Sequence, residues 1–465
     1  MGQPLEARLR IWAGTGESNG APVKVLLINY RYFVSGGPER YMFGVSRLLE
    51  RAGHEVVPFS IRYAQNLPSE WSSYFVSPIA GEDAVYFREH SRTPRVVLKS
   101  LERAFYSPEV YRSLTRLVRN EKPDVALVLH YLRKLSPSVL TALRDNGVPI
   151  VVRLSDFAMV CPQLSLVRDG RICEACVGRT MLPSVRYRCV QGSIAASAVN
   201  ATAMAAARRL RWFDAVDRFI APSSVMREKM VAGGYSAERI VHLPTFVALH
   251  PPDPPPERRR RITYVGRLEP IKGTDVLVEA FAALAGEPQL QDVELAIVGD
   301  DSTPYALQLK NRARDRRLAN MVFSGALDEA AVVQTLSSSL LSVVPSVCHE
   351  NLPNALLESL ACGTPVVGSN ISAIAEALER SEAGALFELG DSADLARLLA
   401  LLLRDRPRLD TMSLNARQLA TTRYSPSRHL DALVGVLEEV SAPRHIWRSH
   451  DHSAASPSSR PTDGG

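Results

Sequence analysis

Short apolar runs alternate with helical patterns in both halves of this 465-residue chain, and this alternation constrains the fold more than any other feature. A short apolar run bounded by turn signals is typical of a buried strand, and an amphipathic segment after it is typical of a covering helix. The repeated order predicts parallel sheets with helices on both faces. Strands are expected at 24–30, 54–61, 125–129, 149–154 and 218–223, and then at 262–268, 293–300, 321–327, 340–346 and 364–369. Helices are expected at 38–52, 135–146, 273–285, 303–316, 328–338, 353–362 and 393–405.

A proline-rich run, "LHPPDPPPERRRR" at 249–261, separates the two halves and is typical of an interdomain linker. The sequence therefore predicts an α/β fold with two doubly wound, Rossmann-like domains that face each other across a cleft. Such a cleft is the default ligand site. The polar ends are expected to be disordered. The predicted segments are an extension at 1–22, a first domain at 23–248, the linker at 249–261, a second domain at 262–424 and a tail at 441–465.

Charge is unevenly distributed along the chain. Residues 1–250 hold 33 Lys and Arg against 21 Asp and Glu, a net charge of +12, whereas residues 251–465 have a net charge of −6. A basic half favours an anionic partner such as a membrane surface, although a solvated arginine-rich surface is the alternative. The segment 88–122 alone carries +5 and is either an interfacial membrane helix or an ordinary amphipathic surface helix. No apolar stretch reaches the roughly 20 residues that span a bilayer, and no signal peptide is recognised, so the cytoplasm is the expected location.

Two glutamates stand eight residues apart in "CHENLPNALLE", residues 348–358, at the expected end of a buried strand. Glu350 falls in the loop after that strand, and Glu358 falls inside the helix that follows. Pro353 suits the first helical position and Gly363 the position just past the helix end. Both glutamates are therefore expected where open α/β sheets bind ligands. Because carboxylates accept from sugar hydroxyls, Glu358 is the candidate for a ribose and Glu350 for the reacting sugar.

Cations and free amide groups are expected at the same edge of the sheets. Arg267 and Lys272, in "YVGRLEPIKG", suit a diphosphate, because Arg offers a planar fork and Lys a point charge. A Gly-Gly pair at the start of a helix lets the backbone approach an anion, and the amides of 351–354 are placed to stabilise a leaving phosphate. Each motif alone is also compatible with a turn or with solvated loop cations. The candidate donor-binding residues are Gly36, Gly37, Arg267, Lys272, Asn351, Leu352, Pro353 and Glu358.

Four of the six cysteines fall in one short segment, 161–189. A Cys-x2-Cys pair flanked by two more thiols fits a tetrahedral zinc site with a structural role. Unliganded thiols and a disulfide framework are the alternatives, and a reducing compartment disfavours the disulfides. The candidate zinc ligands are Cys161, Cys173, Cys176 and Cys189.

Together these motifs resemble glycosyltransferase family 4, whose members are retaining enzymes with the GT-B fold. The resemblance is carried by "SGGPERYMFGVSRLLERAGHEV", "YVGRLEPIKGTDVLVEAF", "LAIVGD" and "PSVCHENLPNALLESLACGTPVVGS", and covers roughly residues 23–440. It implies that a sugar moves from a nucleotide-diphosphate donor to an acceptor with retained anomeric configuration and without a catalytic metal or other cofactor. It also implies that Arg267 and Lys272 bind the diphosphate, Glu358 the ribose and Glu350 the sugar. A helix at 425–440 is implied to cross back to the first domain.

Two positions depart from the pattern of the family. Many relatives have a His-Asp pair where this chain has Ser155-Asp156. His130, at the end of the run 125–129, also faces the expected cleft, although a lone His is often structural. Leu352-Pro353 replaces a common Phe-Gly, which implies an altered choice of sugar. The catalytic candidates are Glu350, His130 and Asp156.

The expected acceptor is a cell-surface glycan or a lipid-linked precursor, met at the inner membrane face by a cytoplasmic or peripheral enzyme. Related and competing hypotheses are a GT-B nucleotide-sugar epimerase, an inactive scaffold, and a nucleic-acid-binding protein that uses the basic half and the cysteines. The last is disfavoured because no DNA- or RNA-binding signature appears, so no nucleic-acid partner is expected.

Overall fold

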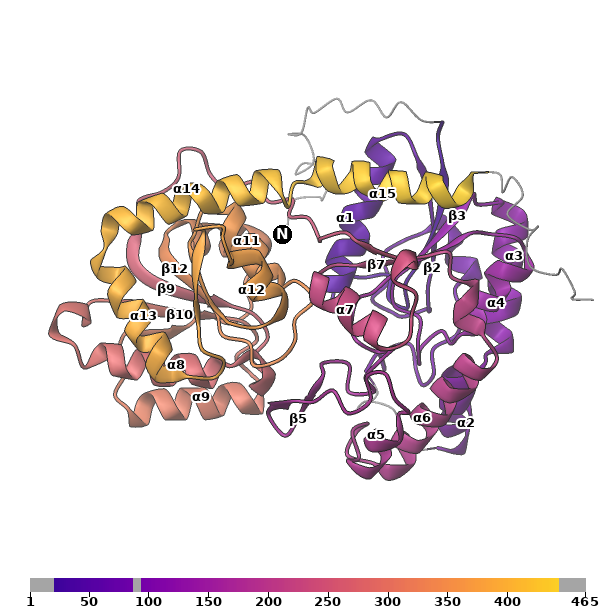
Figure 1. Cartoon of the computed structure of the whole chain (residues 1–465), viewed down its shortest axis with the longest axis horizontal. Helices are drawn as coiled ribbons and strands as arrows, with labels where there is room; N and C mark the ends of the chain where they lie inside the picture. Colours follow the sequence, from indigo (N-terminus) through magenta and orange to yellow (C-terminus); the bar gives the residue numbers. More distant parts are fainter. Residues whose placement is uncertain (1–20, 87–92, 443–465) are drawn as a thin grey trace, which may run out of the picture.

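Two six-stranded parallel sheets organise the computed structural model, which describes residues 21–86 and 93–442 (Figure 1). In each sheet the chain starts near the middle, builds toward one edge and then crosses to the other side, which is the doubly wound arrangement. The predicted fold class of two doubly wound α/β domains is therefore confirmed. The first sheet has the order β2 (Glu55–Phe59), β1 (Lys24–Ile28), β3 (Val125–Val128), β4 (Ile150–Arg153), β7 (Arg218–Ala221) and β8 (Ile240–His242). The second has the order β11 (Met321–Phe323), β10 (Glu294–Val298), β9 (Arg259–Val265), β12 (Ser339–Val344), β13 (Val366–Ser369) and β14 (Gly384–Phe387).

Helices cover both faces of both sheets, and a small antiparallel hairpin, β5 (Val167–Arg168) and β6 (Arg171–Ile172), lies in the cysteine-rich segment. The helices before the linker are α1 (Gly37–Arg51), α2 (Pro94–Phe105), α3 (Pro108–Glu121), α4 (Ser138–Asp145), α5 (Leu182–Arg186), α6 (Ile194–Arg209) and α7 (Ser224–Ala232). After it come α8 (Thr274–Ala285), α9 (Pro304–Asp315), α10 (Glu329–Ser337), α11 (Asn354–Ala361), α12 (Ser372–Leu378), α13 (Ser392–Arg404), α14 (Arg406–Thr422) and α15 (Pro426–Ser441).

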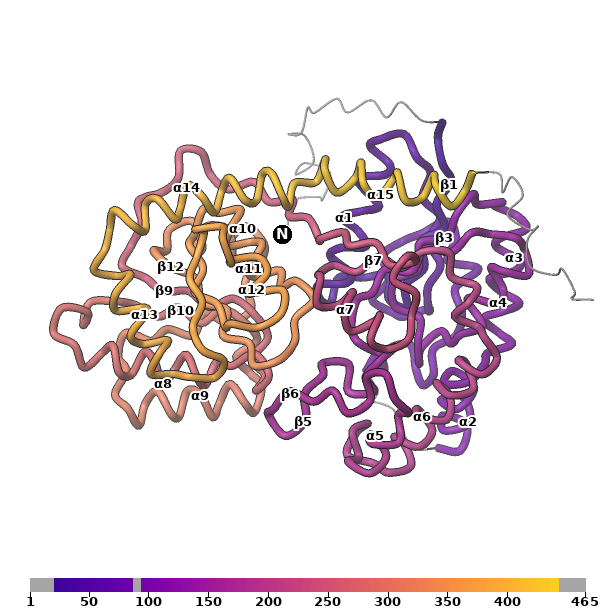
Figure 2. The backbone as a smooth tube through the Cα atoms, viewed as in Figure 1, coloured from indigo at the N-terminus to yellow at the C-terminus, as the bar shows by residue number. Residues whose placement is uncertain are grey.

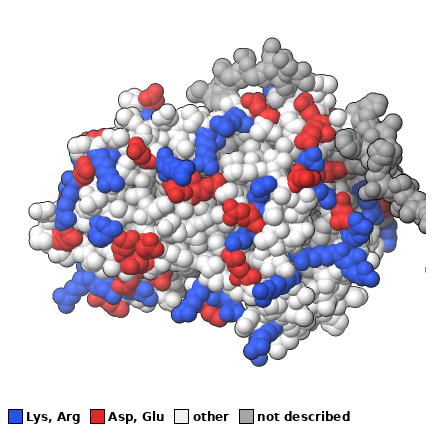
Figure 3. Space-filling model, viewed as in Figure 1, with Lys and Arg blue, Asp and Glu red and all other residues white. Residues whose placement is uncertain are grey.

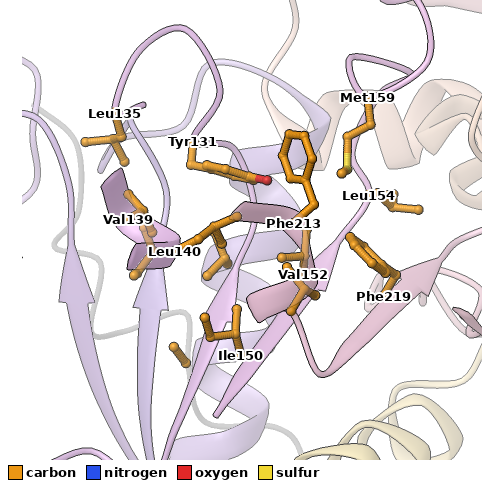
Figure 4. Packing of buried hydrophobic residues seen from close by; sticks show 14 of the residues in the cluster. Tyr131, Leu135, Val139, Leu140, Ile150, Val152, Leu154, Met159, Phe213 and Phe219 are labelled. Atoms are coloured by element: carbon orange, nitrogen blue, oxygen red, sulfur yellow. The ribbon is translucent and has the colours of Figure 1, made fainter. Parts of the chain in front are cut away.

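The first sheet is buried on both faces, which explains why its strands are almost continuously apolar. Along β1, Leu26 and Ile28 belong to one buried cluster and Val25 and Leu27 to another, as the alternation of side chains across a strand requires. Figure 4 shows the first cluster, in which the side chains of β4 pack with those of α4 and with Phe213. This core holds the carboxyl ends of the strands, and the loops after them, in fixed positions.

The structure differs from the sequence prediction in several local features. The segment 88–122 contains two helices, because Ser107 caps α3 and Pro108 begins it; the part at 88–92 lies outside the described residues. The edge strands β8 and β14 were not predicted, since runs of three or four residues carry little periodicity. β9 begins at Arg259, inside the stretch predicted as the linker, because the amide of Arg259 donates to the carbonyl of Ser338 at 2.9 Å.

The chain passes between the domains twice. The outward passage follows β8, and the return lies between α14 and α15; the amide of Val247 donates to the carbonyl of Tyr424 at 3.0 Å and so joins the two passages. Figures 1 and 2 show α14 on the second domain and α15 continuing across the first. Leu433 and Leu437 of α15 are buried in the same cluster as the side chains of β1. α15 is therefore part of the core of the first domain. The domain boundaries given in the sequence analysis remain a prediction.

Candidate active site

Glu350 is held as a carboxylate in the loop between β12 and α11. Its side chain is only 13% exposed, and its Oε1 accepts from Lys272 Nζ at 2.5 Å and from Ser346 Oγ at 2.7 Å. Burial raises the pKa of the Glu350 carboxyl, but the Lys272 ammonium and the Ser346 hydroxyl outweigh burial and leave this pKa below its usual value. The pKa of Lys272 is raised in turn, because the Glu350 carboxylate outweighs the effect of burial. The two groups therefore form a buried ion pair.

Gly273 brings Lys272 to Glu350. This residue has φ +66°, and a Cβ at this position would lie 1.9 Å from the carbonyl oxygen of Pro345. Only glycine lets the turn before α8 pack directly against the loop after β12. Arg267, which leaves the end of β9, is largely exposed and pairs with Glu269 at 2.9 Å. The positive charge of Arg267 contributes to the lowered pKa of Glu350, so it lies within electrostatic range of that carboxyl.

Glu358 takes part in an ion pair that joins the two domains. It lies in the second turn of α11 with a side chain that is 10% exposed, and its Oε1 accepts from Arg40 Nη1 of α1 at 2.7 Å. Burial raises the pKa of Glu358, and Arg40 offsets only part of this rise. Arg40 was not selected from the sequence: it is 318 residues away from its partner, and no local pattern marks it.

The amino-terminal ends of α1 and α11 face each other across the cleft. A Cβ on Gly37, the first residue of α1, would lie 3.4 Å from Nδ2 of Asn354, the first residue of α11. Gly36 is the extended residue just before α1. Pro353 is likewise the extended residue before α11, one position earlier than predicted, while Gly363 follows the helix end with φ +67° as expected. Two helix ends with free N–H groups point to the same place, which suits an anion.

His130 and Asp156 meet at the carboxyl ends of β3 and β4. His130 Nε2 lies 3.2 Å from Asp156 Oδ2, and the amide of Ala158 donates to Asp156 Oδ1 at 2.8 Å. Burial raises the pKa of Asp156, but His130 and this amide outweigh burial and lower it overall. Ser155, at the position of the family's His, accepts from Arg153 Nη1 at 3.2 Å. These residues line a cavity of about 230 Å³ in the first domain.

The loop after β12 connects this cavity to the glutamates. Asn351 Nδ2 donates to the carbonyl of Leu154 at 3.5 Å, and Leu352 packs against the core beneath α11. His349 Nε2 lies 3.7 Å from Oε1 of Glu174, which follows the β5–β6 hairpin. Among the described residues, neither His130 nor Asp156 forms a hydrogen bond or ion pair with Glu350 or Glu358. The structure thus pairs Lys272 with Glu350 in the loop before α11, pairs Arg40 with Glu358 within α11, and leaves the His130–Asp156 pair in a cavity of the first domain.

The zinc prediction is not supported. Within residues 21–86 and 93–442, no three or more His, Cys, Asp or Glu side chains are arranged to hold a metal ion. Cys161 and Cys176 belong to the hydrophobic core of the first domain, where a thiol packs as a small apolar side chain. Burial raises the pKa of Cys176 to about 11, and the neighbouring cysteines Cys161, Cys189 and Cys173 add to this rise. The four thiols lie near one another without the convergence that a tetrahedral site requires, and all six cysteines are free.

Two family models together match most of the chain. The model described as "Glycosyl transferase 4-like domain" matches residues 36–245, and the model described as "Glycosyl transferases group 1" matches residues 248–419.

Curated relatives match at about 30% identity. A "Phosphatidyl-myo-inositol mannosyltransferase" of Mycobacterium leprae is 33% identical over 151 residues, which cover 32% of this chain and 39% of the relative. A protein with the same description from Mycolicibacterium smegmatis is 29% identical over 380 residues, which cover 81% of this chain and 83% of the relative. A "D-inositol 3-phosphate glycosyltransferase" of Thermomonospora curvata is 33% identical over 32% of this chain and 35% of the relative. The chain thus spans less than half the length of the first of these relatives.

Solved structures share the fold at low sequence identity. A sucrose-phosphate synthase from Thermosynechococcus elongatus superposes with a TM-score of 0.64 at 18% identity, over 90% of this chain and 98% of the other. The Anabaena protein Alr3699/HepE, solved in complex with UDP-glucose, superposes with a TM-score of 0.59 at 17% identity, over 90% of this chain and all of the other. With the two parallel sheets, these likenesses identify the GT-B fold, and with the two matching family models they show that the chain belongs to the glycosyltransferases of family 4, the group 1 glycosyl transferases.

Proposed function

We propose that this protein is a retaining glycosyltransferase that moves a sugar from a nucleotide-diphosphate donor to a hydroxyl of an acceptor in the cleft. The observation that carries the proposal is a set of two buried glutamates, each paired with a cation, on the loop and helix whose start faces the start of α1. Carboxylates suit the sugar and ribose hydroxyls, whereas helix ends and cations suit the diphosphate. The resemblance to family 4 adds the expectation that the reaction is independent of a catalytic metal.

In the proposed reaction, the bond between the anomeric carbon and the diphosphate oxygen breaks while the acceptor oxygen bonds to the same face of the sugar. The acceptor proton passes to the departing phosphate oxygen, so no external base is required. Arg267, Lys272 and the ends of α1 and α11 stabilise the negative charge that develops on the diphosphate. Glu350 holds the donor sugar. Glu358 holds the ribose, whose hydroxyls have to share this carboxylate with Arg40.

The acceptor is proposed to enter the cavity of the first domain, beside the His130–Asp156 pair. Asp156 fixes the orientation of the imidazole, and His130 then positions the hydroxyl that receives the sugar. The descriptions of the relatives named above include inositol, which supports an acceptor with a small, hydroxyl-rich head group. The proposed acceptor is therefore a glycan or lipid-linked precursor with such a head group.

Donor binding tests this assignment. Replacing Arg267 by Ala or Glu358 by Gln removes a charged hydrogen-bond partner, which costs about 1.5–3 kcal/mol, or roughly a 10- to 150-fold weaker affinity. Calorimetric titration with a panel of nucleoside diphosphates and their sugars measures this loss. Arg397→Ala is the matched control, because Arg397 is an exposed Arg of the same domain whose one ion-pair partner among the described residues is Asp394. Equal affinity in all three variants would contradict the donor site, and an inverted anomeric centre in the product would contradict retention.

We also propose that the protein works at the inner membrane face and docks through α2, α5 and α6. α3 cannot serve as an interfacial helix, because Val110, Leu114 and Leu117 are buried in the core. α2 packs on α6, and α6 packs on α5; together they form a corner of the first domain, which is mostly uncharged in the view of Figure 3 with basic residues nearby. Exposed apolar side chains beside cations suit an anionic lipid surface. This α2–α5–α6 patch consists of Val97, Leu98, Leu101, Leu182 and Ile194, with the exposed Arg95, Arg186 and Arg188.

No helix in the described ranges is long and apolar enough to cross a membrane, so docking through this patch would be peripheral. Leu98 is 69% exposed, and replacing it by Asp should weaken binding to anionic vesicles about tenfold or more, because burying a Leu side chain is worth roughly 1.5–3 kcal/mol. Leu414→Asp is the control, since Leu414 is 71% exposed on the second domain. Co-sedimentation should fall in about 1 M salt, where the Debye length is about 3 Å. Binding that ignores lipid charge, salt and Leu98 would show that the patch has no such role.

A further inference from the structure

Glu358 differs from Glu350 in where its partner comes from. Lys272 and Ser346, which bond to Glu350, belong to the same domain as Glu350 itself. Among the described residues, the side chain of Glu358 has one hydrogen-bond and ion-pair partner, Arg40 of the first domain, whose Nη1 lies 2.7 Å from Oε1. A carboxylate that is removed from water needs such a partner, because burial penalises its charged form. The charge of Glu358 is therefore compensated across the interface between the domains.

Arg40 is carried on a rigid part of the first domain. It is the fourth residue of α1, and its backbone amide donates to the carbonyl of Gly36 at 3.1 Å. Tyr41, the next residue, is buried in the core of the first domain. Because the start of α1 at Gly37 lies against the start of α11 at Asn354, the two helices hold the guanidinium beside the second turn of α11.

The charges around Glu358 act in opposite directions. Burial is the largest influence on the pKa of Glu358 and raises it; the Arg40 guanidinium lowers it, and Glu329 at the start of α10 raises it further. α11 also packs on β12 and β13, which carry no titratable side chain, and on α14, whose Arg417 lies at the far end of α11 beside Gly363. Without Arg40, burial and Glu329 would both favour the neutral carboxylic acid.

The charge of this carboxyl decides how well it can hold a ribose. An ionised carboxylate accepts from two neighbouring hydroxyls through its two oxygens, whereas the neutral acid turns one of these oxygens into a donor. Within the described ranges, Oε2 of Glu358 accepts no hydrogen bond, and Arg40 occupies Oε1. Oε2 and the remaining lone pair of Oε1 are therefore available to a ribose while Arg40 stays in place.

We propose that Arg40 is a positioning residue of the donor site, which keeps Glu358 charged for the ribose while the first domain contacts the second. This inference rests on the proposed function, which assigns the ribose to Glu358. It makes the nucleotide site of the second domain depend on a side chain of the first. By linkage, a bound nucleotide then favours contact between the domains as much as this contact favours the nucleotide. Arg40 acts through Glu358 and requires no contact of its own with the diphosphate.

The first test follows nucleotide affinity against pH. Titration calorimetry with UDP and with GDP compares the full wild-type chain with Arg40→Gln between about pH 6 and about pH 9. Removing the guanidinium raises the folded-state pKa of Glu358. Arg40→Gln should therefore bind the nucleoside diphosphates about tenfold more weakly near about pH 7, and this difference should shrink toward about pH 9, where the carboxyl is ionised in both proteins. Comparing the two proteins at each pH cancels the titration of the phosphates.

Two variants of α1 serve as controls. Arg40→Lys restores a cation and should recover most of the affinity. Arg47→Gln changes an exposed Arg of the same helix and should match the wild type at every pH. Circular dichroism shows whether each variant is folded.

A double variant shows whether Arg40 acts through Glu358. In the background of Glu358→Gln, whose side chain does not ionise, adding Arg40→Gln should change the affinity by less than about twofold, because the route of its effect has been removed. The affinity for 2′-deoxy-UDP should also depend less on Arg40 than the affinity for UDP, since 2′-deoxy-UDP presents one ribose hydroxyl fewer.

The outcomes separate this inference from the proposed function. A loss of affinity in Arg40→Gln that is equal at every pH, or that persists in the Glu358→Gln background, would overturn the inference, because Arg40 would then contact the nucleotide itself or act only on the fold. Unchanged affinity in Arg40→Gln would overturn it as well. If the wild type binds nucleoside diphosphates through Arg267 and Glu358 whatever stands at position 40, only this inference fails. If the wild type binds none of them, the proposed function fails and the inference with it.

Discussion

Lys272→Met should cost about 3–5 kcal/mol of unfolding free energy and lower the rate of sugar transfer at least ~100-fold. The side chain of Lys272 is the only cation that bonds to Glu350 among the described residues, and this carboxylate is 13% exposed. Without Lys272, the charge of Glu350 stays buried and unpaired. Urea unfolding followed by circular dichroism measures the loss of stability, and donor turnover measures the loss of activity.

The pH dependence of this variant has a definite sign. Burial is the largest influence on the pKa of Glu350, and without the ammonium the effects that oppose it, from the Ser346 hydroxyl and Arg267, are weaker, so we expect the folded-state pKa of Glu350 in the variant to rise above its unfolded value. The folded state then binds a proton more readily than the unfolded state, so Lys272→Met should recover stability as the pH falls from about 7 to 5. The wild type should show no such gain from this pair.

Two further variants isolate the ion pair. Lys310→Met removes a comparable but more exposed pair with Asp301, and should cost less than about 1 kcal/mol. The double variant Lys272→Met, Glu350→Gln should regain much of the stability and none of the activity, because it leaves no unpaired charge but lacks both donor contacts. If Lys272→Met is as stable and as active as Lys310→Met, Lys272 has neither the structural nor the catalytic role assigned to it.

Glu376→Ala should cost about 3 kcal/mol and loosen the contact between the domains. Glu376 lies on α12 of the second domain and accepts from the amide and hydroxyl of Ser224, at the start of α7 in the first domain, at 2.8 and 2.7 Å. It also lies 3.3 Å from His242 Nε2 and 3.1 Å from Arg423 Nη2. Its loss leaves His242, Arg423 and the start of α7 without their acceptor. Unfolding experiments should measure the loss of stability, and the radius of gyration from small-angle scattering should measure the looser contact between the domains.

The expected loss of unfolding free energy in Glu376→Ala follows from the lowered pKa of Glu376. Burial raises the pKa of Glu376, but His242 and Ser224 outweigh burial and lower it to about 2. A lowered folded-state pKa stabilises the protein above the unfolded value near 4.5, and this contribution disappears as the pH falls toward 2. The exposed Glu379→Ala at the end of the same helix is the control. An unchanged radius of gyration and an unchanged acid transition in Glu376→Ala would show that this residue does not hold the domains together.

Structural features that are set by residues close together in the chain could be predicted from the sequence. The strand–loop–helix order around Glu350 and Glu358 follows from an apolar run, a Pro and a Gly, and each of these acts within a few residues. The cross-domain partners could not be predicted, because Arg40 and Glu358, or Ser224 and Glu376, become neighbours only through tertiary folding.

The cysteines show the limit of a spacing rule. The Cys-x2-Cys pattern is the same whether the thiols converge on a metal or turn into a core, and the surrounding apolar side chains decide between the two. Cys161 and Cys176 are buried among such side chains. A similar limit applies to α2 and α3, which share one amphipathic pattern but differ in exposure, because α3 buries Val110, Leu114 and Leu117 in the core of the first domain whereas α2 packs on α6.

The path of α15 has a consequence for how the protein is made and engineered. Because Leu433 and Leu437 complete the core of the first domain, that domain cannot finish folding on the ribosome until α15 has left the exit tunnel, long after its sheet has been synthesised. The second domain is in effect an insertion between two parts of the first. A chimera that exchanges donor specificity should therefore replace the second domain as a cassette cut at both passages, near Val247 and Tyr424, and keep the native α15 with its own partner.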